Sequence, residues 1–572
     1  MIWMDEYKKW LSSPAVDAEI KAELEQIKDD ENEIKERFYK NLEFGTAGLR
    51  GIIAAGTNRM NIYTVRKATQ GIAADIINCG EVDGGVVISY DSRLKSYEFA
   101  METAKVLAAN GIKAYVFDEL RPVPELSFAV RHLKTSRGIM ITASHNPKEY
   151  NGYKAYGSDG SQLPPESSDY VTSIIDSIDI FDGVKVMDEV DAKAKGLIEI
   201  IGADVDAAYL AAVKEQSINE ENYKTLGDNF KVVYSPFHGS GNKPVRKILE
   251  MTGLKNVTVV PEQELPDPDF STVKSPNPEE KEGFALAIEL AKKENADLIF
   301  ATDPDCDRIG VVVKTANGDY VTLNGNQMGV LLTEFIFRNK KAKGTLPANG
   351  ALIKTIVSTS MVYPIAEEYG VKTYDVLTGF KFIGEMIKDF EENDYYNQYL
   401  FGFEESYGYL AGTHARDKDA VVASMLACQM AADYKARGMS LYEGLINLYE
   451  KYGFYLERTT TKTFAGIDGA EQIKAIMENC RANPVKEING VKVTEMWDVQ
   501  KGTALIADGT EKDLGLPSSN VLKFIFEDNS WFAMRPSGTE PKIKFYFGVC
   551  CNSLDAANAD LDTFSEKILK IM

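Results

Sequence analysis

Cysteine and histidine are scarce in this chain of 572 residues, which has six cysteines and four histidines. No two cysteines form a C-x-x-C pair, and no histidine belongs to an H-E-x-x-H motif or lies at zinc-site spacing from a cysteine. So few cysteines in so long a chain cannot form the dense disulfide framework of small secreted domains. The sequence therefore excludes a disulfide scaffold, predicts reduced thiols and disfavours a zinc site.

Long apolar runs are also missing. The segment MGVLLTEFIF is interrupted by Glu334 and is far shorter than the roughly 20 residues of a membrane helix. The first ten residues, MIWMDEYKKW, lack the basic region and apolar stretch of a secretory signal. These absences predict a cytoplasmic protein that does not bind membranes.

Positive charge is in deficit, with 64 lysines and arginines against 86 aspartates and glutamates, a net charge of −22. A surface of this sign repels phosphate backbones and anionic lipids, so neither nucleic acid nor a membrane is predicted as a partner. An anionic substrate would need cations supplied by its own site.

The chain is long enough for about four domains. Strand-like runs such as 86–89 and 298–301 alternate with helix-like runs such as 99–110 as far as about residue 450. This alternation predicts α/β units with mostly parallel sheets. Residues 1–40 predict a leading helical arm, and strand–turn–strand runs before a closing helix at 554–571 predict an α+β unit at the end.

A candidate nucleophile, Ser144, lies in the segment GIMITASHNP (138–147), where an apolar strand ends in a polar loop. Doubly wound sheets place ligands at such strand ends. The loop is not a G-x-S-x-G elbow, because Thr142 and Asn146 occupy the glycine positions. The alternative is a plain turn with a capping serine.

Three aspartates, Asp303, Asp305 and Asp307, alternate in a short loop between two apolar runs. Like charges this close favour a bound cation, and oxygen ligands favour Mg²⁺. An EF-hand is excluded because Arg308 and Lys314 occupy its glycine and glutamate positions. The alternative is a solvated acidic turn.

Three further loops combine small or hydroxyl residues with charge. The segment RPSGTEPKIK (535–544) offers amides, hydroxyls and cations for an anion. The segment FEESYG (403–408) offers carboxylates and a hydroxyl that suit sugar diols, with an acidic helix start as the alternative. The segment LTGFKFIG (377–384) is a glycine turn with a lysine.

Taken together, four segments resemble the signature loops of the α-D-phosphohexomutases, in that family's order. They are TASHNP (142–147), DPDCDR (303–308), EESYG (404–408) and RPSGTEPK (535–542). Within the family, EESYG and TGFK (378–381) are similar to the phosphoglucomutase branch and its phosphopentomutase relatives.

The resemblance implies three successive mixed α/β domains plus a C-terminal α+β domain around a central cleft. The predicted divisions are 1–205 for the phosphoserine, 206–320 for the metal, 321–455 for the sugar and 456–572 for the phosphate.

The resemblance also implies a role for each matching residue. Ser144 would be the phosphorylated nucleophile and would share Mg²⁺ with Asp303, Asp305 and Asp307. Catalysis would also involve Arg50, His145 and Lys418, the latter two as candidate bases. Substrate would be bound by Arg308, Thr378, Lys381, Glu404, Ser406, Arg535, Ser537, Gly538 and Thr539.

The implied reaction interconverts glucose 1-phosphate and glucose 6-phosphate through a phosphoserine enzyme and glucose 1,6-bisphosphate. Alternatives are a phosphopentomutase or phosphomannomutase, a sugar-bisphosphate synthase with an outside donor, and a catalytically inactive sugar-phosphate-binding protein. The presence of Ser144 and all three aspartates disfavours the inactive protein. The implied partner is a small-molecule phosphosugar, and no oligomeric state is predicted.

Overall fold

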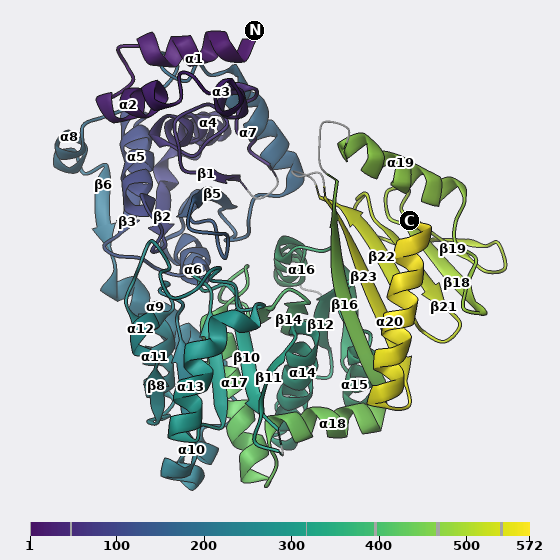
Figure 1. Cartoon of the computed structure of the whole chain (residues 1–572). Helices are drawn as coiled ribbons and strands as arrows, with labels where there is room; N and C mark the ends of the chain where they lie inside the picture. The colour runs from purple at the N-terminus through teal and green to yellow at the C-terminus, as the bar shows by residue number, and fades with distance from the viewer. Residues whose placement is uncertain (1, 46–47, 316, 394–396, 465–468, 538–541) are drawn as a thin grey trace.

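The computed structural model describes residues 2–45, 48–315, 317–393, 397–464, 469–537 and 542–572, whose strands form four sheets (Figure 1). Three sheets are mixed and flanked by helices, and the fourth is antiparallel. The predicted fold class, three mixed α/β domains followed by an α+β domain, is confirmed. We call the four parts the first to fourth units in chain order.

The first unit has a six-stranded sheet with the order β1-β5-β4-β2-β3-β6. Its strands are β1 (Leu49–Ile52), β2 (Val86–Tyr90), β3 (Ala114–Phe117), β4 (Arg137–Ile141), β5 (Tyr150–Gly157) and β6 (Ile198–Ile201). Its helices are α4 (Ile62–Cys79), α5 (Ser96–Ala109), α6 (Val123–Leu133), α7 (Pro165–Ser177) and α8 (Glu189–Ala194). Local sequence explains the bounds of α4, because Asn61 and Thr64 form a capping box and Gly80 takes a φ of 72° at the other end.

The predicted N-terminal arm is helical and folds onto the first unit, at the top of Figure 1. It consists of α1 (Ile2–Ser12), α2 (Ala18–Gln26) and α3 (Glu31–Phe38). Trp10 is fully buried, and its ring meets those of Tyr63 and Phe181 edge to face at centroid distances of 5.4 Å. Aromatic packing therefore attaches the arm to the first unit.

The second and third units repeat the α/β plan. The second sheet, in the order β11-β10-β9-β7-β8, contains β7 (Val232–Ser235), β8 (Val257–Val259), β9 (Leu298–Thr302), β10 (Ile309–Lys314) and β11 (Tyr320–Leu323). Its helices are α9 (Ala203–Lys214), α10 (Glu221–Leu226), α11 (Asn242–Met251), α12 (Pro261–Glu264) and α13 (Ala285–Glu294). The third sheet, in the order β13-β12-β14-β15, contains β12 (Gly350–Thr355), β13 (Lys372–Val376), β14 (Gln398–Glu404) and β15 (Gly408–Ala411). Its helices are α14 (Gly325–Ala342), α15 (Val362–Tyr369), α16 (Phe380–Glu392), α17 (Ala420–Ala436) and α18 (Leu441–Tyr452).

The fourth unit is an antiparallel sheet in the order β16-β23-β22-β21-β18-β19-β20, with β17 paired to β18. Its strands are β16 (Phe454–Thr463), β17 (Glu487–Ile488), β18 (Val491–Asp498), β19 (Thr503–Ile506), β20 (Glu511–Asp513), β21 (Leu522–Phe526), β22 (Trp531–Pro536) and β23 (Lys542–Cys551). Its helices are α19 (Gly469–Ala482) and α20 (Leu554–Ile571), and α20 has the bounds that the sequence predicted.

All three predicted divisions fall inside an element of the structure. The division after residue 205 falls inside α9. The division after residue 320 falls inside β11, which pairs with β10 of the second sheet. The division after residue 455 falls inside β16, which pairs with β23 of the fourth sheet. We group each strand with the sheet that satisfies its backbone hydrogen bonds.

The prediction of mostly parallel sheets is wrong at the edges that carry the motifs. The loops at 142–149, 303–308 and 405–407 each join two antiparallel neighbours, β4 to β5, β9 to β10 and β14 to β15. The fourth motif begins in β22 and ends in β23, which are also antiparallel, and its residues 538–541 lie outside the described residues. Each of the first three motifs therefore occupies a turn between two adjacent strands, where its position is fixed by the sheet on both sides.

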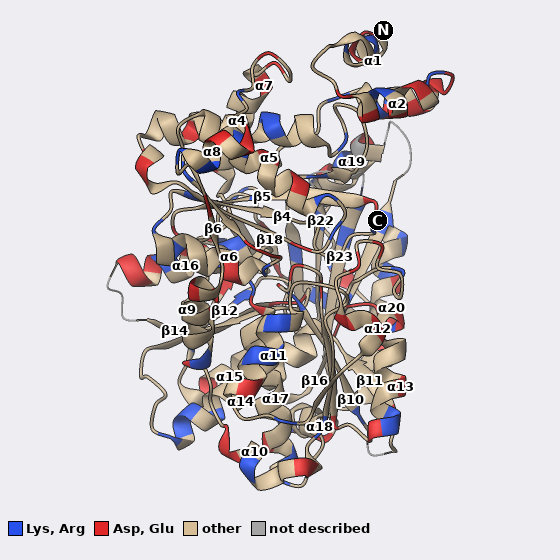
Figure 2. Ribbon diagram, turned by 90° about the vertical axis from the view of Figure 1, so that its left-hand side faces the viewer, with Lys and Arg blue, Asp and Glu red and all other residues tan. Residues whose placement is uncertain are grey.

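Outer helices such as α2, α10 and α13 carry acidic and basic residues together (Figure 2). Among the described residues, no helix is both long and apolar enough to cross a membrane.

Candidate active site

Ser144 follows β4 and is 3% exposed. Its φ of 52° is unfavourable for a residue with a side chain and persists only where the surroundings hold it. The Ser144 amide donates to Thr142 Oγ1 at 2.8 Å, and the Thr142 hydroxyl donates to Asp91 Oδ2 at 2.6 Å. The loop is therefore held in the shape that presents the Ser144 hydroxyl.

Arg93, which lies shortly after β2, holds the same loop. Its buried guanidinium donates to the carbonyl oxygens of Ser144 at 2.6 Å, Pro147 at 2.9 Å and Tyr150 at 3.0 Å. An arginine suits this task because its donors have a fixed, planar arrangement. No role of its own was predicted for Arg93, and only the folded loop shows that it positions Ser144.

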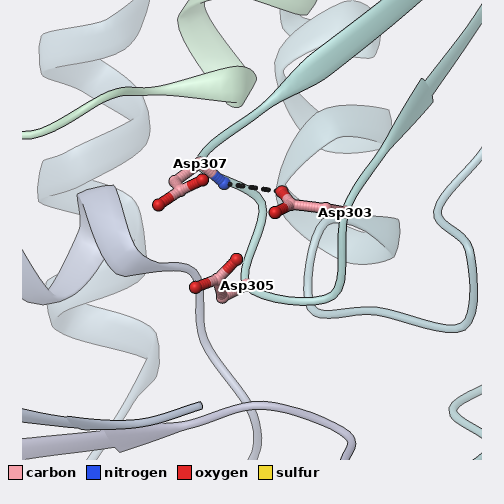
Figure 3. A group of neighbouring side chains, drawn as sticks. All are labelled: Asp303, Asp305 and Asp307. Carbon is pink, nitrogen blue, oxygen red and sulfur yellow. Dashed lines mark hydrogen bonds between the residues drawn. The ribbon is translucent and has the colours of Figure 1, made fainter. Parts of the chain in front are cut away.

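The aspartates Asp303, Asp305 and Asp307 are buried in the loop between β9 and β10. One carboxylate oxygen from each lies within 4.8 Å of the others, and Figure 3 shows the three groups close together. Burial, followed by the charges of Asp305 and Asp307, raises the pKa of Asp303 well above its usual range. The alternative of a solvated acidic turn is wrong, because the loop is buried.

The chemistry of this triad fits a divalent cation. Asp305 Oδ1 and Asp307 Oδ1 are buried and have no hydrogen-bond partner among the described residues. A buried carboxylate oxygen without a partner is costly, so both are open ligand positions. The oxygen donors favour a hard ion such as Mg²⁺.

Two buried lysines face the aspartates. Lys154 Nζ, on β5, lies 2.9 Å from Asp305 Oδ2 and 3.5 Å from Asp307 Oδ2. Lys418 Nζ lies 3.1 Å from Asp307 Oδ2. Burial acts to lower the pKa of each lysine, but the aspartates raise both above their usual range, so both stay ammonium ions. Lys154 was missed by sequence reasoning, although a lysine within the otherwise uncharged strand YNGYKAYG is a signal that could have found it.

The serine loop and the aspartate loop meet directly. Ser144 Oγ donates to Asp303 Oδ2 at 2.8 Å, across 159 residues of sequence. The two side chains come from different sheets and were paired in the sequence only through the family resemblance. The structure therefore places the candidate nucleophile against the candidate metal ligands.

The backbone of the aspartate loop is bonded to its neighbours on two sides. The amide of Val123, at the start of α6 in the first unit, donates to the Asp305 carbonyl at 2.9 Å. The third unit supplies the Ala420 amide to the Cys306 carbonyl at 3.2 Å and the Tyr407 carbonyl to the Ile309 amide at 3.2 Å. The position of the loop thus depends on three units.

His145, Arg50 and Arg308 lie around the serine. His145 Nδ1 is 3.1 Å from Ser144 Oγ, and Arg50 on β1 donates to Asn146 Oδ1 at 3.2 Å. Burial, followed by the charges of Arg308 and Arg50, lowers the pKa of His145 well below its usual range. The imidazole is therefore neutral at physiological pH and can accept a proton.

Glu404 ends β14 and is 5% exposed. Burial raises its pKa to about 7, although Lys418 acts in the opposite direction. Ser406 is half-buried in the adjacent loop, and Arg308 forms a backbone bridge with Gly408. The loop that resembles the sugar loop of the family thus adjoins the aspartate loop.

Thr378 and Lys381 flank the start of α16. Thr378 Oγ1 is buried without a hydrogen-bond partner among the described residues. Burial, and next the nearby charge of Arg535, lowers the pKa of Lys381. Lys381 of the third unit and Arg535 of the fourth therefore lie close enough for their positive charges to interact.

In the fourth unit, Arg535 lies on β22 beside Tyr546 of β23, where it acts against the burial that raises the pKa of this tyrosine. The Ser537 amide donates to the Lys542 carbonyl at 2.8 Å. Gly538 and Thr539 lie outside the described residues. Figure 1 shows this sheet on the opposite side of the molecule from the first unit.

The ionisation of Glu404 predicts a pH dependence. The resemblance implies that Glu404 holds sugar hydroxyls; an ionised carboxylate can accept hydrogen bonds from two of them, and its protonated form loses part of that capacity. Measured kcat/KM for the phosphosugar that the resemblance implies should therefore rise between pH 6 and 8, by up to about tenfold for a pKa near 7. Glu404→Gln should lower kcat/KM and remove this rise.

The matched control is Glu392→Gln, in an exposed position of α16, which should keep the rise. A Glu404→Gln enzyme with the wild-type pH profile would assign the ionisation to another group.

Comparison with known proteins agrees with this geometry. Four models of the phosphoglucomutase/phosphomannomutase family match the chain: alpha/beta/alpha domain I at residues 41–180, domain II at 207–318, domain III at 324–452, and the C-terminal domain at 473–559. A phosphoglucomutase from Staphylococcus haemolyticus is 38% identical over 529 residues, covering 92% of this chain and 93% of the relative. One from Staphylococcus aureus is 37% identical over 543 residues and covers 95% of both chains.

Solved structures share the fold. The chain resembles a putative phosphomannomutase from Thermus thermophilus with a TM-score of 0.68 and 23% identity, covering 93% of this chain and 99% of that one. It resembles the open form of a Paramecium phosphoglucomutase, parafusin, with a TM-score of 0.71 and 18% identity, covering 93% and 95%.

A buried serine hydroxyl directed at a triad of carboxylates, with cations on either side, suits the transfer of a phosphoryl group. The protein is an intramolecular phosphotransferase of the isomerase class. The chain belongs to the phosphoglucomutase/phosphomannomutase family. The resemblance to the α-D-phosphohexomutases, seen first in four short segments, is confirmed over the length of the chain.

Proposed function

We propose that the protein interconverts glucose 1-phosphate and glucose 6-phosphate, with Ser144 as the residue that carries the phosphoryl group. The hydrogen bond from Ser144 Oγ to Asp303 is the observation that carries this proposal. The relatives named phosphoglucomutase, at 37% and 38% identity, support glucose as the sugar.

The proposed metal is Mg²⁺, held by Asp303, Asp305, Asp307 and an oxygen of the phosphorylated Ser144. When bound, the ion would neutralise charge on the transferring phosphoryl group. Arg308 and Arg50 would add positive charge on the same side, and their fixed donors suit phosphate oxygens. Lys154 and Lys418 would keep the acidic loop close to neutral.

The transfer itself exchanges one P–O bond for another. The sugar hydroxyl attacks the phosphorus of phosphoserine, a new P–O bond forms to the sugar, and the bond from phosphorus to Ser144 Oγ breaks. The proton of the attacking hydroxyl must reach the serine oxygen. His145 is proposed as the group that carries it, because its Nδ1 lies 3.1 Å from that oxygen. Lys418 is disfavoured, because its raised pKa keeps it protonated.

The product of this step, glucose 1,6-bisphosphate, would turn in the site and return its other phosphoryl group to Ser144. Glu404 and Ser406 are proposed to hold the sugar hydroxyls in either orientation, with Thr378 and Lys381 selecting the sugar. Arg535, Ser537, Gly538 and Thr539 are proposed to bind the phosphate that is not reacting.

The direct test is a coupled assay that supplies glucose 1-phosphate, Mg²⁺ and a trace of glucose 1,6-bisphosphate. We expect formation of glucose 6-phosphate, and intact mass should show one phosphate on the chain after incubation with the bisphosphate. Faster turnover of ribose 1-phosphate or mannose 1-phosphate would instead support the phosphopentomutase or phosphomannomutase alternative.

Arg535→Ala should raise KM for glucose 1-phosphate. Losing one charge-assisted hydrogen bond costs about 1.5–3 kcal/mol, which is roughly a 10- to 150-fold change. The matched control is Arg458→Ala, which removes a partly exposed arginine from β16 of the same sheet. Equal kinetic constants for Arg535→Ala and the wild type would remove Arg535 from the phosphate site.

A further inference from the structure

Residues 355–359, at the end of β12, form a short turn that contacts the loop carrying Glu404 and Ser406. We call this segment the 355–359 turn. The Thr355 hydroxyl donates to Glu405 Oε2 at 3.0 Å, and the Ser358 hydroxyl donates to the same oxygen at 3.3 Å. Glu405 directly follows Glu404, so this turn fixes the backbone next to the proposed sugar-binding carboxylate.

The fourth unit binds the same turn with a buried lysine. Lys523 on β21 is 4% exposed, and its Nζ donates to the Ile356 carbonyl at 2.6 Å. The ammonium lies 5.0 Å from the ring centroid of Trp497 and 4.6 Å from that of Trp531. Its neighbours are thus two tryptophan rings of its own unit and one backbone carbonyl of the third unit.

A second contact from the fourth unit reaches the end of the turn. Glu457 on β16 lies beside Thr359 and Asn326: burial raises its pKa to about 7, and the two side chains act in the opposite direction. The Thr359 amide in turn donates to Asn326 Oδ1 at 3.0 Å. The turn is therefore a place where polar groups of the fourth sheet meet the third unit.

A lysine is less favourable than an apolar residue for packing at position 523. Burial, followed by the positive charge of Lys354, lowers the pKa of Lys523 to about 7, while Asp375 and Glu495 act in the opposite direction. An apolar side chain of similar length would fill this space without desolvating a charge. What the ammonium adds is its bond to the Ile356 carbonyl.

We propose that Lys523 is a positioning residue for the sugar loop, acting through the 355–359 turn on Glu405. The docked position of the phosphate-binding unit then sets the position of Glu404 and Ser406. This inference rests on the proposed function, in which the fourth unit holds the distal phosphate while the 404–406 segment holds the sugar. It adds that the two sites are coupled through one hydrogen-bonded path.

Such coupling suits a substrate that must be bound in two orientations. Both sites contact the non-reacting part of the substrate, so loosening one through the other weakens ground-state and transition-state binding alike. The signature of that loss is a raised KM with little change in kcat.

The test compares Lys523→Met with Lys512→Met, an exposed lysine on β20 of the same sheet. Lys523→Met should raise KM for glucose 1-phosphate by about tenfold, the lower end expected for a charged hydrogen bond, and should change kcat by less than about threefold. Lys523→Arg, which keeps a cation able to stack on aromatic rings, should restore most of the affinity. Lys512→Met should match the wild type.

A double-mutant cycle with Glu405→Gln separates this path from a purely structural role. If Lys523 acts through Glu405, the effects of Lys523→Met and Glu405→Gln on KM should be strongly non-additive. Independent, multiplying effects would overturn the proposal, as would an unchanged KM in Lys523→Met.

Two further measurements test the proposal if the Lys523→Met chain does not fold. Thr355→Val combined with Ser358→Ala leaves Lys523 in place and should raise KM to the same extent; a wild-type KM would overturn the proposal. Trp497 and Trp531 are two of the four tryptophans, so glucose 1-phosphate should change wild-type fluorescence, and this change should shrink in Glu405→Gln. Failure of the proposed function is a separate result, because the wild type and Lys512→Met would then also lack turnover.

Discussion

Replacing Ser144 with alanine should lower mutase turnover by about four orders of magnitude or more, because Ser144 is the proposed carrier of the phosphoryl group between the two ends of the sugar. Removal of a covalent nucleophile has effects of this size in enzymes whose catalytic groups act as a unit. The coupled assay measures the loss, and intact mass should show no phosphate added by glucose 1,6-bisphosphate.

The matched control is Ser173→Ala in α7 of the same unit, where the hydroxyl bonds only to the Tyr170 carbonyl among the described residues. Its turnover and phosphate uptake should equal those of the wild type. Turnover retained by Ser144→Ala would end the phosphoserine mechanism.

Replacing Asp305 with asparagine should raise the Mg²⁺ concentration required for half-maximal activity by about 100-fold or more. Outer-shell partners of a metal already affect affinity by 10- to 100-fold, and Asp305 is placed to be a direct ligand. Its Oδ1 is one of the two buried oxygens of the aspartate triad that have no hydrogen-bond partner among the described residues. The measurement is activity against Mg²⁺ concentration, with isothermal titration of Mg²⁺ as a readout independent of turnover.

Asp269→Asn is the control, since Asp269 is an exposed aspartate of the same unit that pairs with Lys148. It should bind Mg²⁺ as the wild type does. An Asp305→Asn chain with the wild-type metal dependence would take Asp305 off the ligand set.

Much of the fold was predictable because its signals are local. The helix 554–571 was placed by its own periodicity, and buried runs such as β2 and β9 were found because they are apolar between turn residues. The reversal of direction at β5 and β10 was not predictable in the same way. The sequence of a motif loop of six to eight residues does not show whether the next strand pairs antiparallel with the strand before the loop or crosses over to another position in the sheet.

The site residues also divide into those that local sequence identifies and those that it does not. Ser144, the aspartates and Arg535 stand in dense polar motifs, so their sequence neighbours identify them. Lys154 and Arg93 were missed or given no role because each acts on a loop distant in sequence. Their contacts exist only after β5 and β2 have taken their places in the sheet, and no pattern of neighbouring residues records that.

The bonds that hold the aspartate loop have a consequence for fragments of the chain. Residues 207–318 contain every carboxylate of the triad, yet the loop backbone is bonded to Val123, Tyr407 and Ala420, all outside that stretch. Expressed alone, this stretch would expose the bonded amide and carbonyl groups of the loop to water. It would keep the three carboxylates but lose the contacts that position them. The geometry of the triad is thus a property of the assembled protein, and no single unit could be transplanted with that geometry intact.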